Sequence, residues 1–322
     1  MNVSSRTLKY GLLTAAACVA LGSCSKLFSP CGSGEIPDTD QTETLLKAHV
    51  FHLADSIGER NVYKPGTMER SARYIEKTLA DMGYAVTRQA VNIPPSGEFG
   101  AVKDRTAYNL IATKKGTSLR PRMLIVGAHY DTKVGMDNWH DHGPARPART
   151  GTPGANDNAS GVAAMLRALA LFAERGVSPE RDVVFLATDG EESDKDGARA
   201  FAALLEERYA SVNLINIDCI GHAGRDFIDI YTEKQAGINP LAQALAEAGT
   251  AQGARVRQEI YSGDGAVLGI GNRLAVTLSD ALYEGEAPHT AEDVPERLDY
   301  ARIEGATACG ELPCTDACGA AF

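Results

Sequence analysis

The sequence predicts one α/β domain with a largely parallel, twisted sheet and helices on both faces. Short apolar, β-branched runs recur along the chain, and amphipathic segments of helical length lie between several of them. The 322 residues, 44% apolar and 23% charged, are enough to bury a full core and show no repeat or low-complexity linker. A single globular domain is therefore expected.

The expected elements alternate along the chain once two N-terminal helices have passed. Those helices are expected at 43–58 and 68–82, where apolar residues recur at helical spacing. Seven strands are expected, at 85–91, 107–113, 123–128, 182–187, 212–217, 227–231 and 274–278. Helices between them are expected at 159–173, 198–208 and 240–248. Strands alternating with helices predict parallel pairing, with a ligand crevice beyond the carboxyl ends of the strands.

The first 24 residues predict a secretory signal. Arg6 and Lys9 precede an apolar stretch, from Tyr10 to Leu21, that is too short for an ordinary transmembrane helix. The end of this stretch, "LGSC" at 21–24, resembles the bacterial lipobox, whose cysteine is lipidated; plain cleavage nearby is the alternative. We therefore expect a protein of the cell envelope, lipid-anchored at Cys24 to a bacterial membrane, or secreted or periplasmic.

The remaining boundaries follow from composition. Residues 25–41 are expected to form a flexible tether, 42–308 the folded domain and 309–322 a cysteine-containing tail. One disulfide in the tail is consistent with an oxidising compartment, but the sequence does not determine its pairing, and the spacing is not that of a paired C-x-x-C zinc site. The cysteines beyond the signal are Cys31, Cys219, Cys309, Cys314 and Cys318.

The net charge of −10 and the lack of basic clusters argue against nucleic-acid partners. They also argue against an anionic-membrane surface, which leaves the anchor at Cys24 as the expected membrane contact.

Side chains that bind metals follow the expected strands or the turns between them. Because the ends of parallel strands meet at one edge of a sheet, we expect these side chains to converge there. They are His129, Asp131, Asp157, Glu191, Glu192, Asp218 and His289.

Each of these residues has an ordinary interpretation when it is taken alone. Asp157 can cap the helix that follows it, Glu191 and Glu192 can form a solvated loop, and Asp218 can bond to a turn. Placement of so many at successive strand ends favours a shared site. Crowded acids raise one another's pKa values, whereas a divalent cation between them favours their charged forms.

Imidazole and carboxylate donors together indicate zinc, while all-oxygen sites suit calcium or magnesium. Even five donors from this set exceed what one catalytic zinc takes from protein. They suffice for two zinc ions that share one carboxylate, about 3.5–4 Å apart.

Five motifs occur in the order seen in a known family. They are "HYD" at 129–131, "GANDNASG" at 154–161, "GEE" at 190–192, "NIDCIG" at 216–221 and "PHTAEDVPERLD" at 288–299. The chain resembles the bacterial two-zinc aminopeptidases of clan MH, zinc exopeptidases related to the glutaminyl cyclases. The resemblance covers roughly residues 48–303, including "GERNVYKPG" at 58–66, and implies the phosphorylase/hydrolase-like architecture of that clan.

The resemblance implies a set of ligands. Asp157 is the bridging carboxylate, His129 and Asp218 complete one zinc site, and Glu192 and His289 complete the other.

It also implies catalytic roles and peptides as substrates. Glu191 acts as the general base on a bridging water and then protonates the departing amine, while Asp131 orients His129. Asp189 is expected to be a turn residue rather than a ligand. The implied reaction is removal of N-terminal residues from peptides.

The chain departs from the family pattern in several places. Pro288 stands where many relatives have a tyrosine, so the carbonyl-polarising hydroxyl must come from elsewhere, and Tyr261 is the weak substitute. "SDKDGARAF" at 193–201 lacks the usual Gly-Leu pair, and the loop at 132–153, with Trp139, looks long. A one-zinc glutaminyl cyclase is the main alternative function, and a non-catalytic peptide-binding lipoprotein is a further one.

Overall fold

The computed structural model describes part of the chain. The described residues are 39–93, 106–117, 122–133, 151–174, 176, 179–205, 211–224, 227–232, 239–251, 255–260, 267–268, 273–280 and 288–307. The expected signal, nearly all of the tether and the tail lie outside these residues, as do Trp139, Tyr261 and every cysteine of the mature chain except Cys219. Among the described residues, no helix has the length and apolar character needed to cross a membrane.

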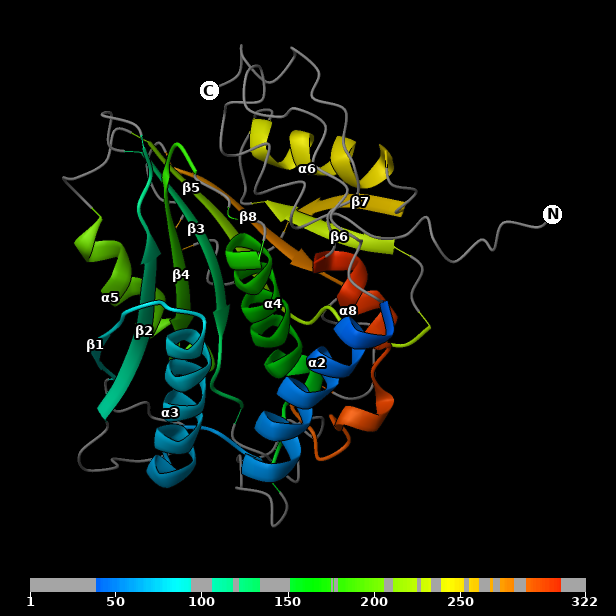
Figure 1. Cartoon of the computed structure of the whole chain (residues 1–322). Helices are drawn as coiled ribbons and strands as arrows, with labels where there is room; N and C mark the ends of the chain where they lie inside the picture. Colours follow the sequence, from blue (N-terminus) through cyan, green and yellow to red (C-terminus); the bar gives the residue numbers. More distant parts are fainter. Residues whose placement is uncertain are drawn as a thin grey trace.

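The described residues form one mixed sheet with helices packed against it (Figure 1). The strands are β1 (Val86–Asn92), β2 (Thr106–Lys114), β3 (Arg122–His129), β4 (Asp182–Thr188), β5 (Ser211–Ile217), β6 (Phe227–Thr232), β7 (Arg255–Ile260) and β8 (Leu274–Ser279). The helices are α2 (Thr39–Phe51), α3 (Pro65–Asp81), α4 (Gly161–Glu174), α5 (Asp196–Leu204), α6 (Pro240–Ala251) and α8 (Tyr300–Thr307).

The strand order in the sheet is β1-β2-β4-β3-β5-β8-β6-β7. The pairs β3–β4, β3–β5, β5–β8 and β6–β7 are parallel. The pairs β1–β2, β2–β4 and β6–β8 are antiparallel. The predicted α/β fold with a mostly parallel sheet is confirmed, and the parallel strands form its centre.

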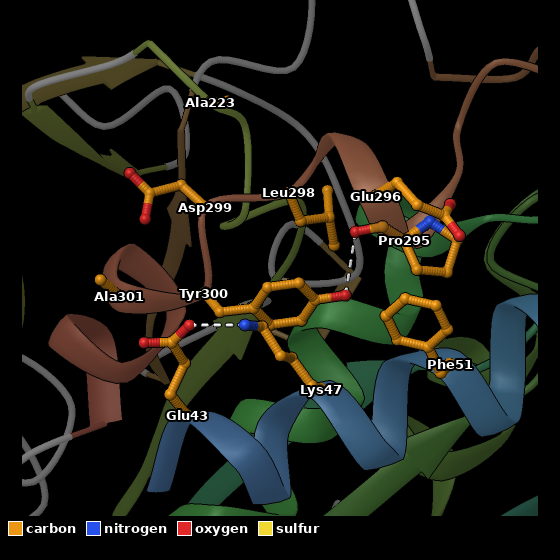
Figure 2. Close-up of a pocket in the computed structure, with 10 residues that line it drawn as sticks. All are labelled: Glu43, Lys47, Phe51, Ala223, Pro295, Glu296, Leu298, Asp299, Tyr300 and Ala301. Carbon is orange, nitrogen blue, oxygen red and sulfur yellow. Dashed lines mark hydrogen bonds and ion pairs between the residues drawn. The ribbon is translucent and has the colours of Figure 1, made fainter. Parts of the chain in front are cut away.

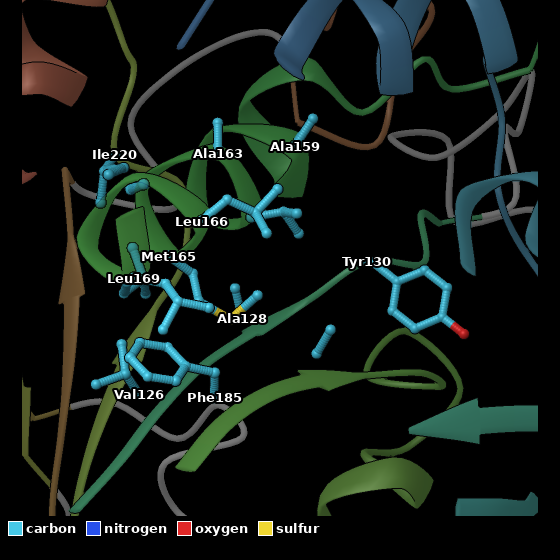
Figure 3. Packing of buried hydrophobic residues seen from close by; sticks show 14 of the residues in the cluster. Val126, Ala128, Tyr130, Ala159, Ala163, Met165, Leu166, Leu169, Phe185 and Ile220 are labelled. Carbon is cyan, nitrogen blue, oxygen red and sulfur yellow. The ribbon is translucent and has the colours of Figure 1, made fainter. Parts of the chain in front are cut away.

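Helices cover both faces of the sheet because the side chains of its central strands alternate. On β3, Val126 and Ala128 belong to the core that includes Leu169 of α4, shown in Figure 3. Ile125 belongs to a second core on the opposite face, together with Phe201 of α5. A strand buried on both faces reads as a continuous apolar run, which is why "MLIVGA" shows no alternation in the sequence.

Two elements were missing from the sequence-based expectation. Strand β7, "RVRQEI", lies at one edge of the sheet. Only two of its residues are apolar, so it lacks the apolar run that marks a central strand. Helix α8 has only eight residues and carries Tyr300 and Ile303 into the main core. Its length is too short for helical periodicity to reveal it.

Candidate metal centre

The parallel register brings the polar residues that end or follow β3, β4 and β5 to one edge of the sheet. His129 is the last residue of β3 and pairs in register with Thr188, the last residue of β4. Strand β5 is also parallel to β3, and Asp218 follows it directly. The prediction that these strands end at the same edge is confirmed.

The structure brings all five predicted metal ligands together as two groups of potential donors. One group contains His129, Asp157 and Asp218, and the other contains Asp157, Glu192 and His289. Within each group the donor atoms lie within 4.8 Å of one another. Asp157 belongs to both groups.

The two oxygens of Asp157 face different histidines. Its Oδ1 lies 3.1 Å from Nε2 of His129, and its Oδ2 lies 3.0 Å from Nε2 of His289. A further carboxylate lies near the same nitrogen of each ring, with Asp218 Oδ1 3.3 Å from His129 Nε2 and Glu192 Oε1 3.4 Å from His289 Nε2. The shared carboxylate therefore stands between two similar imidazole–carboxylate pairs.

Charges of opposite sign dominate the electrostatics of this cluster. Burial alone disfavours charge, but the neighbouring carboxylates outweigh it and raise the pKa of His289 to about 11 and that of His129 well above its usual value. For Asp157, burial is likewise outweighed by the two histidines, so the pKa of its carboxyl falls below the ordinary range. These acids thus require positive charge between them.

The donor set fits a zinc ion. Imidazole nitrogens and carboxylate oxygens are the donors that zinc takes in catalytic sites, and ligation requires neutral imidazole, so a bound cation takes over the role of the histidine protons. Glu192 Oε1 is buried and makes no hydrogen bond to protein, which leaves it available as a donor atom.

Asp131 connects the two halves of the site. Its Oδ1 lies 3.4 Å from Nδ1 of His129, on the side of the ring away from Asp157. The same carboxylate accepts hydrogen bonds from the backbone N–H groups of Glu191 and Glu192, each at 3.2 Å. Asp131 therefore fixes both the ring of His129 and the backbone of the glutamate pair.

The two adjacent glutamates have different surroundings. Glu192 belongs to a donor group, whereas Glu191 does not and has Nζ of Lys195 3.5 Å from its Oε1. Lys133 donates to the carbonyl of Glu192 and lies 3.6 Å from its Oε2. The two adjacent carboxylates therefore have different neighbours, and the tasks that the resemblance implies for them stay predictions.

The turn after the glutamates forms without the glycine that the family pattern has. Asp194 and Lys195 adopt positive φ values of 120° and 61°, which are unfavourable for side-chain-bearing residues. Glu191 O accepts the N–H groups of both residues, so the turn keeps its hydrogen bonds. The positive φ values are therefore accommodated within this turn.

Asp157 does not cap α4, which resolves the alternative left open by the sequence. Its neighbour Asn158 takes that role, accepting the N–H of Gly161 and also the N–H of Cys219 on its Oδ1. Asn158 Nδ2 donates to Ile217 O at the end of β5. Asn158 thus ties the turn to β5, and both Asp157 oxygens stay free to face the histidines.

Asp293 is a site residue that the sequence analysis missed. Its carboxylate accepts the N–H groups of Asn156 at 2.7 Å and Asp157 at 3.0 Å, and it is 1% exposed. Burial raises its pKa to about 7 although these two amides lower it. The only signal in the sequence is an acid four residues after His289, because the contact itself spans 136 residues.

Asp189 is buried beside the site but is not among the donor groups. Its Oδ2 accepts the N–H of Tyr108 and the hydroxyl of Tyr130, and its Oδ1 makes no hydrogen bond. Burial and the charge of Asp131 raise its pKa well above normal. Asp189 was expected to be a turn residue rather than a ligand; it lies directly after β4, outside both donor groups, and its side chain is buried.

A separate cavity of about 660 Å³ lies between α2 and the segment 295–301 (Figure 2). Lys47, one of its lining residues, pairs with Glu43 at 2.8 Å, and Tyr300 donates to Pro295 O. None of its lining residues belongs to the two donor groups.

Comparison with known proteins adds a family match. The model described as "Peptidase family M28" matches residues 109–308. An uncharacterized protein, YfbL, of Escherichia coli is 31% identical over 182 residues, 55% of this chain and 49% of its own. A probable zinc metalloprotease of Pyricularia oryzae is 36% identical over 216 residues, which cover 60% of this chain and 40% of that protein. The chain spans about half or less of the length of these curated relatives.

Solved structures share the fold at low sequence identity. BSAP, a zinc aminopeptidase from Bacillus subtilis, superposes with a TM-score of 0.68 at 15% identity, covering 82% of this chain and 93% of that one. A glutaminyl cyclase from Bacteroides thetaiotaomicron, bound to N-acetylhistamine, gives 0.63 at 19% identity, covering 85% and 96%. Likeness at this level shows the architecture and does not separate the two activities.

Proposed function

Because the chain belongs to peptidase family M28, we propose that it is a zinc-dependent aminopeptidase that hydrolyses N-terminal residues from peptides. The family match confirms the resemblance to the clan MH zinc exopeptidases that the five motifs indicated. It also supports a hydrolase. The choice of aminopeptidase over the other activities of this fold rests on the site.

The shared carboxylate carries the proposal. Asp157 presents one oxygen to each histidine, and each histidine has a further carboxylate beside it, so the arrangement supports two zinc ions with Asp157 between them. A site built for a single ion needs only one of the two groups. The pairing of His129 with Asp218 is the feature that a one-zinc site leaves unexplained.

Zinc, when bound, supplies Lewis acidity that polarises a substrate carbonyl and lowers the pKa of water. The chain's own residues supply proton transfer and orientation. We assign Glu191 as the general base, since it directly precedes Glu192 in the chain and belongs to neither donor group; it takes a proton from water and then delivers it to the leaving amine. Asp131 keeps His129 and the glutamate backbone in place for this step.

The residue that polarises the carbonyl alongside the metal is not assigned. Pro288 offers no hydroxyl at the position before His289, and Tyr261 lies outside the described residues, so its role stays a prediction.

The proposal is tested on purified protein with a panel of aminoacyl peptides and peptides that begin with glutamine. We expect close to two zinc equivalents, release of N-terminal residues, and loss of activity on chelation. Glu191→Gln should keep its zinc while turnover falls by roughly 10²–10⁴-fold, because size is retained and the base is removed. Glu192→Gln is the matched variant and should lose zinc instead.

Two outcomes would replace the proposal. One zinc equivalent with conversion of glutamine peptides to pyroglutamyl peptides would establish the cyclase alternative. Peptide binding without turnover on any substrate would establish the non-catalytic alternative. We also propose that the protein acts at the cell envelope, on the basis of the signal-like sequence at 1–24.

A further inference from the structure

Arg60 is a completely buried cation whose guanidinium binds backbone rather than side chains. It is 0% exposed, and its side chain donates to five carbonyl oxygens at 2.7–3.0 Å. Burying a guanidinium is costly unless its donors are satisfied, so a residue placed in this way holds the segments around it in fixed positions. These carbonyls belong to Leu53, Gly58, Tyr130, Pro153 and Gly154.

Two of the bound segments lead directly to the metal centre. Nε of Arg60 donates to the carbonyl of Tyr130, the residue between His129 and Asp131. Nη1 and Nη2 donate to Pro153 and Gly154, just before the turn that carries Asp157. The remaining carbonyls come from the π-helical turn His52–Ile57 and its end, so one side chain joins three parts of the chain.

The backbone of Arg60 strengthens the same connection. Its N–H donates to Oγ1 of Thr132, and its carbonyl accepts the N–H of Thr132 at 2.6 Å. Gly154 has φ of +64°, and a Cβ there would lie 2.2 Å from Cγ2 of Thr132 and 3.1 Å from Nη2 of Arg60. Glycine is therefore required at residue 154 by its positive φ and by the close approach of Thr132, and the guanidinium packs directly against this turn.

Arg60 also places a positive charge near three acids of the site. Burial lowers its pKa to about 10, against the opposing charges of Asp293, Asp131 and Asp157, so it is still a cation at neutral pH. The hydrogen bonds of its side chain go to the five carbonyls, and the acids act on it through charge.

We propose that Arg60 is a positioning residue of the metal centre, which holds His129 through the carbonyl of Tyr130 and Asp157 through the carbonyls of Pro153 and Gly154. The inference rests on the proposed zinc site but not on the identity of the substrate. Asp293 holds the same turn from its N–H groups, so Asp157 is fixed by an arginine on one side and an aspartate on the other. Loss of the guanidinium removes the hydrogen bonds to the carbonyls of Pro153 and Gly154, so that this end of the turn is no longer held.

The test uses Arg60→Lys, which keeps the charge and loses the planar fork. Arg181→Lys is the matched control, since Arg181 is another buried arginine (2% exposed), adjacent to the amino end of β4 and opposite the site. Zinc affinity of the metal-free proteins is measured by competition with a chromogenic chelator, and the visible spectrum is recorded after loading with Co²⁺. Circular dichroism establishes that each variant is folded.

We expect Arg60→Lys to bind zinc about 10–100-fold more weakly than wild type, with an altered cobalt spectrum, because outer residues that orient ligands have effects of this size. kcat should fall more than KM changes. Arg181→Lys should match wild type in zinc affinity, in the cobalt spectrum and in kcat and KM. A folded Arg60→Lys with wild-type zinc affinity and cobalt spectrum would overturn the inference.

Thr132→Val decides the case in which Arg60→Lys does not fold. It removes the hydroxyl that accepts the Arg60 N–H and leaves the guanidinium, so zinc affinity should fall several-fold. Unchanged zinc binding in this variant, beside an unfolded Arg60→Lys, would show that Arg60 serves folding only. A wild type that binds zinc without cleaving aminoacyl peptides would refute the proposed function and leave this inference standing.

Discussion

Asp131 accepts hydrogen bonds from the backbone of the glutamate pair and faces His129. The change Asp131→Asn keeps the size and shape of this side chain but removes its charge and one acceptor, so it should disturb the metal centre. The amide oxygen can take the place of Oδ1, facing the N–H of Glu191 and the ring of His129. The amide nitrogen then stands where Oδ2 accepts the N–H of Glu192, and two donors face each other at about the present 3.2 Å.

The expected loss follows from these contacts. One charge-assisted hydrogen bond disappears and one buried N–H is left unpaired, which together cost roughly 2–4 kcal/mol. In a domain of this size that lowers Tm by about 4–7 °C in the metal-free protein. Zinc affinity should fall about 10–100-fold because His129 and Glu192 both lose an orienting partner. Calorimetry with and without chelator and a zinc competition assay measure the two effects separately.

Asp189→Asn is the matched control, a buried aspartate at the end of the adjacent strand. Its Oδ2 accepts both of its hydrogen bonds, and an amide oxygen can do the same. Burial and the charge of Asp131 raise the pKa of Asp189 well above normal, so the carboxyl is more protonated in the folded than in the unfolded chain.

That difference in protonation gives the control a pH dependence of known sign. Since the folded protein binds more protons at this residue, the wild type loses stability as pH rises above the unfolded pKa of about 4, and an asparagine does not. Asp189→Asn should therefore equal or exceed the wild type in Tm, with an advantage that increases above pH 4, and should keep its zinc. Equal loss of zinc in Asp131→Asn and Asp189→Asn, or no loss in Asp131→Asn, would refute the reasoning.

Two further predictions follow from the site and from the sequence. Asp157→Asn should weaken both proposed zinc sites together, because the carboxylate belongs to both donor groups, whereas His289→Ala should impair one; equilibrium dialysis that finds equal zinc in wild type and both variants would contradict the ligand assignment. Cys24→Ala should release the protein from membranes or leave it unprocessed, since acyl chains provide the attachment of a lipoprotein. Unchanged fractionation would favour simple signal cleavage.

Much of the sheet was predictable from sequence because its central strands are buried on both faces. Continuous apolar runs mark β3 and β4, β5 is mostly apolar, and the polar residues that follow these strands are visible in the sequence. Pairing direction was not visible at the edges, where β1 and β2 run antiparallel to their neighbours. Direction depends on which strands become neighbours, and residue pattern alone does not encode that.

The supporting residues of the site show the same division. Asp293 and Arg60 each contact the Asp157 turn across more than ninety residues of chain, with backbone groups as partners. Backbone partners leave no residue-type signature, so a sequence pattern cannot identify them. An acid or an arginine at these positions reads as an ordinary surface charge until the fold buries it.

The sequence by itself determined the α/β class, the five donor residues and their order, because ligand chemistry and strand burial both depend on residue type and local spacing. Only the tertiary structure decided that Asp157 faces two histidines with its two oxygens and that Glu191 stays outside the donor groups. It also decided that Asp131, Asp293 and Arg60 fix the backbone around them. The physical reason is that these relations are distances between segments remote in sequence, which the packing of the sheet and helices sets.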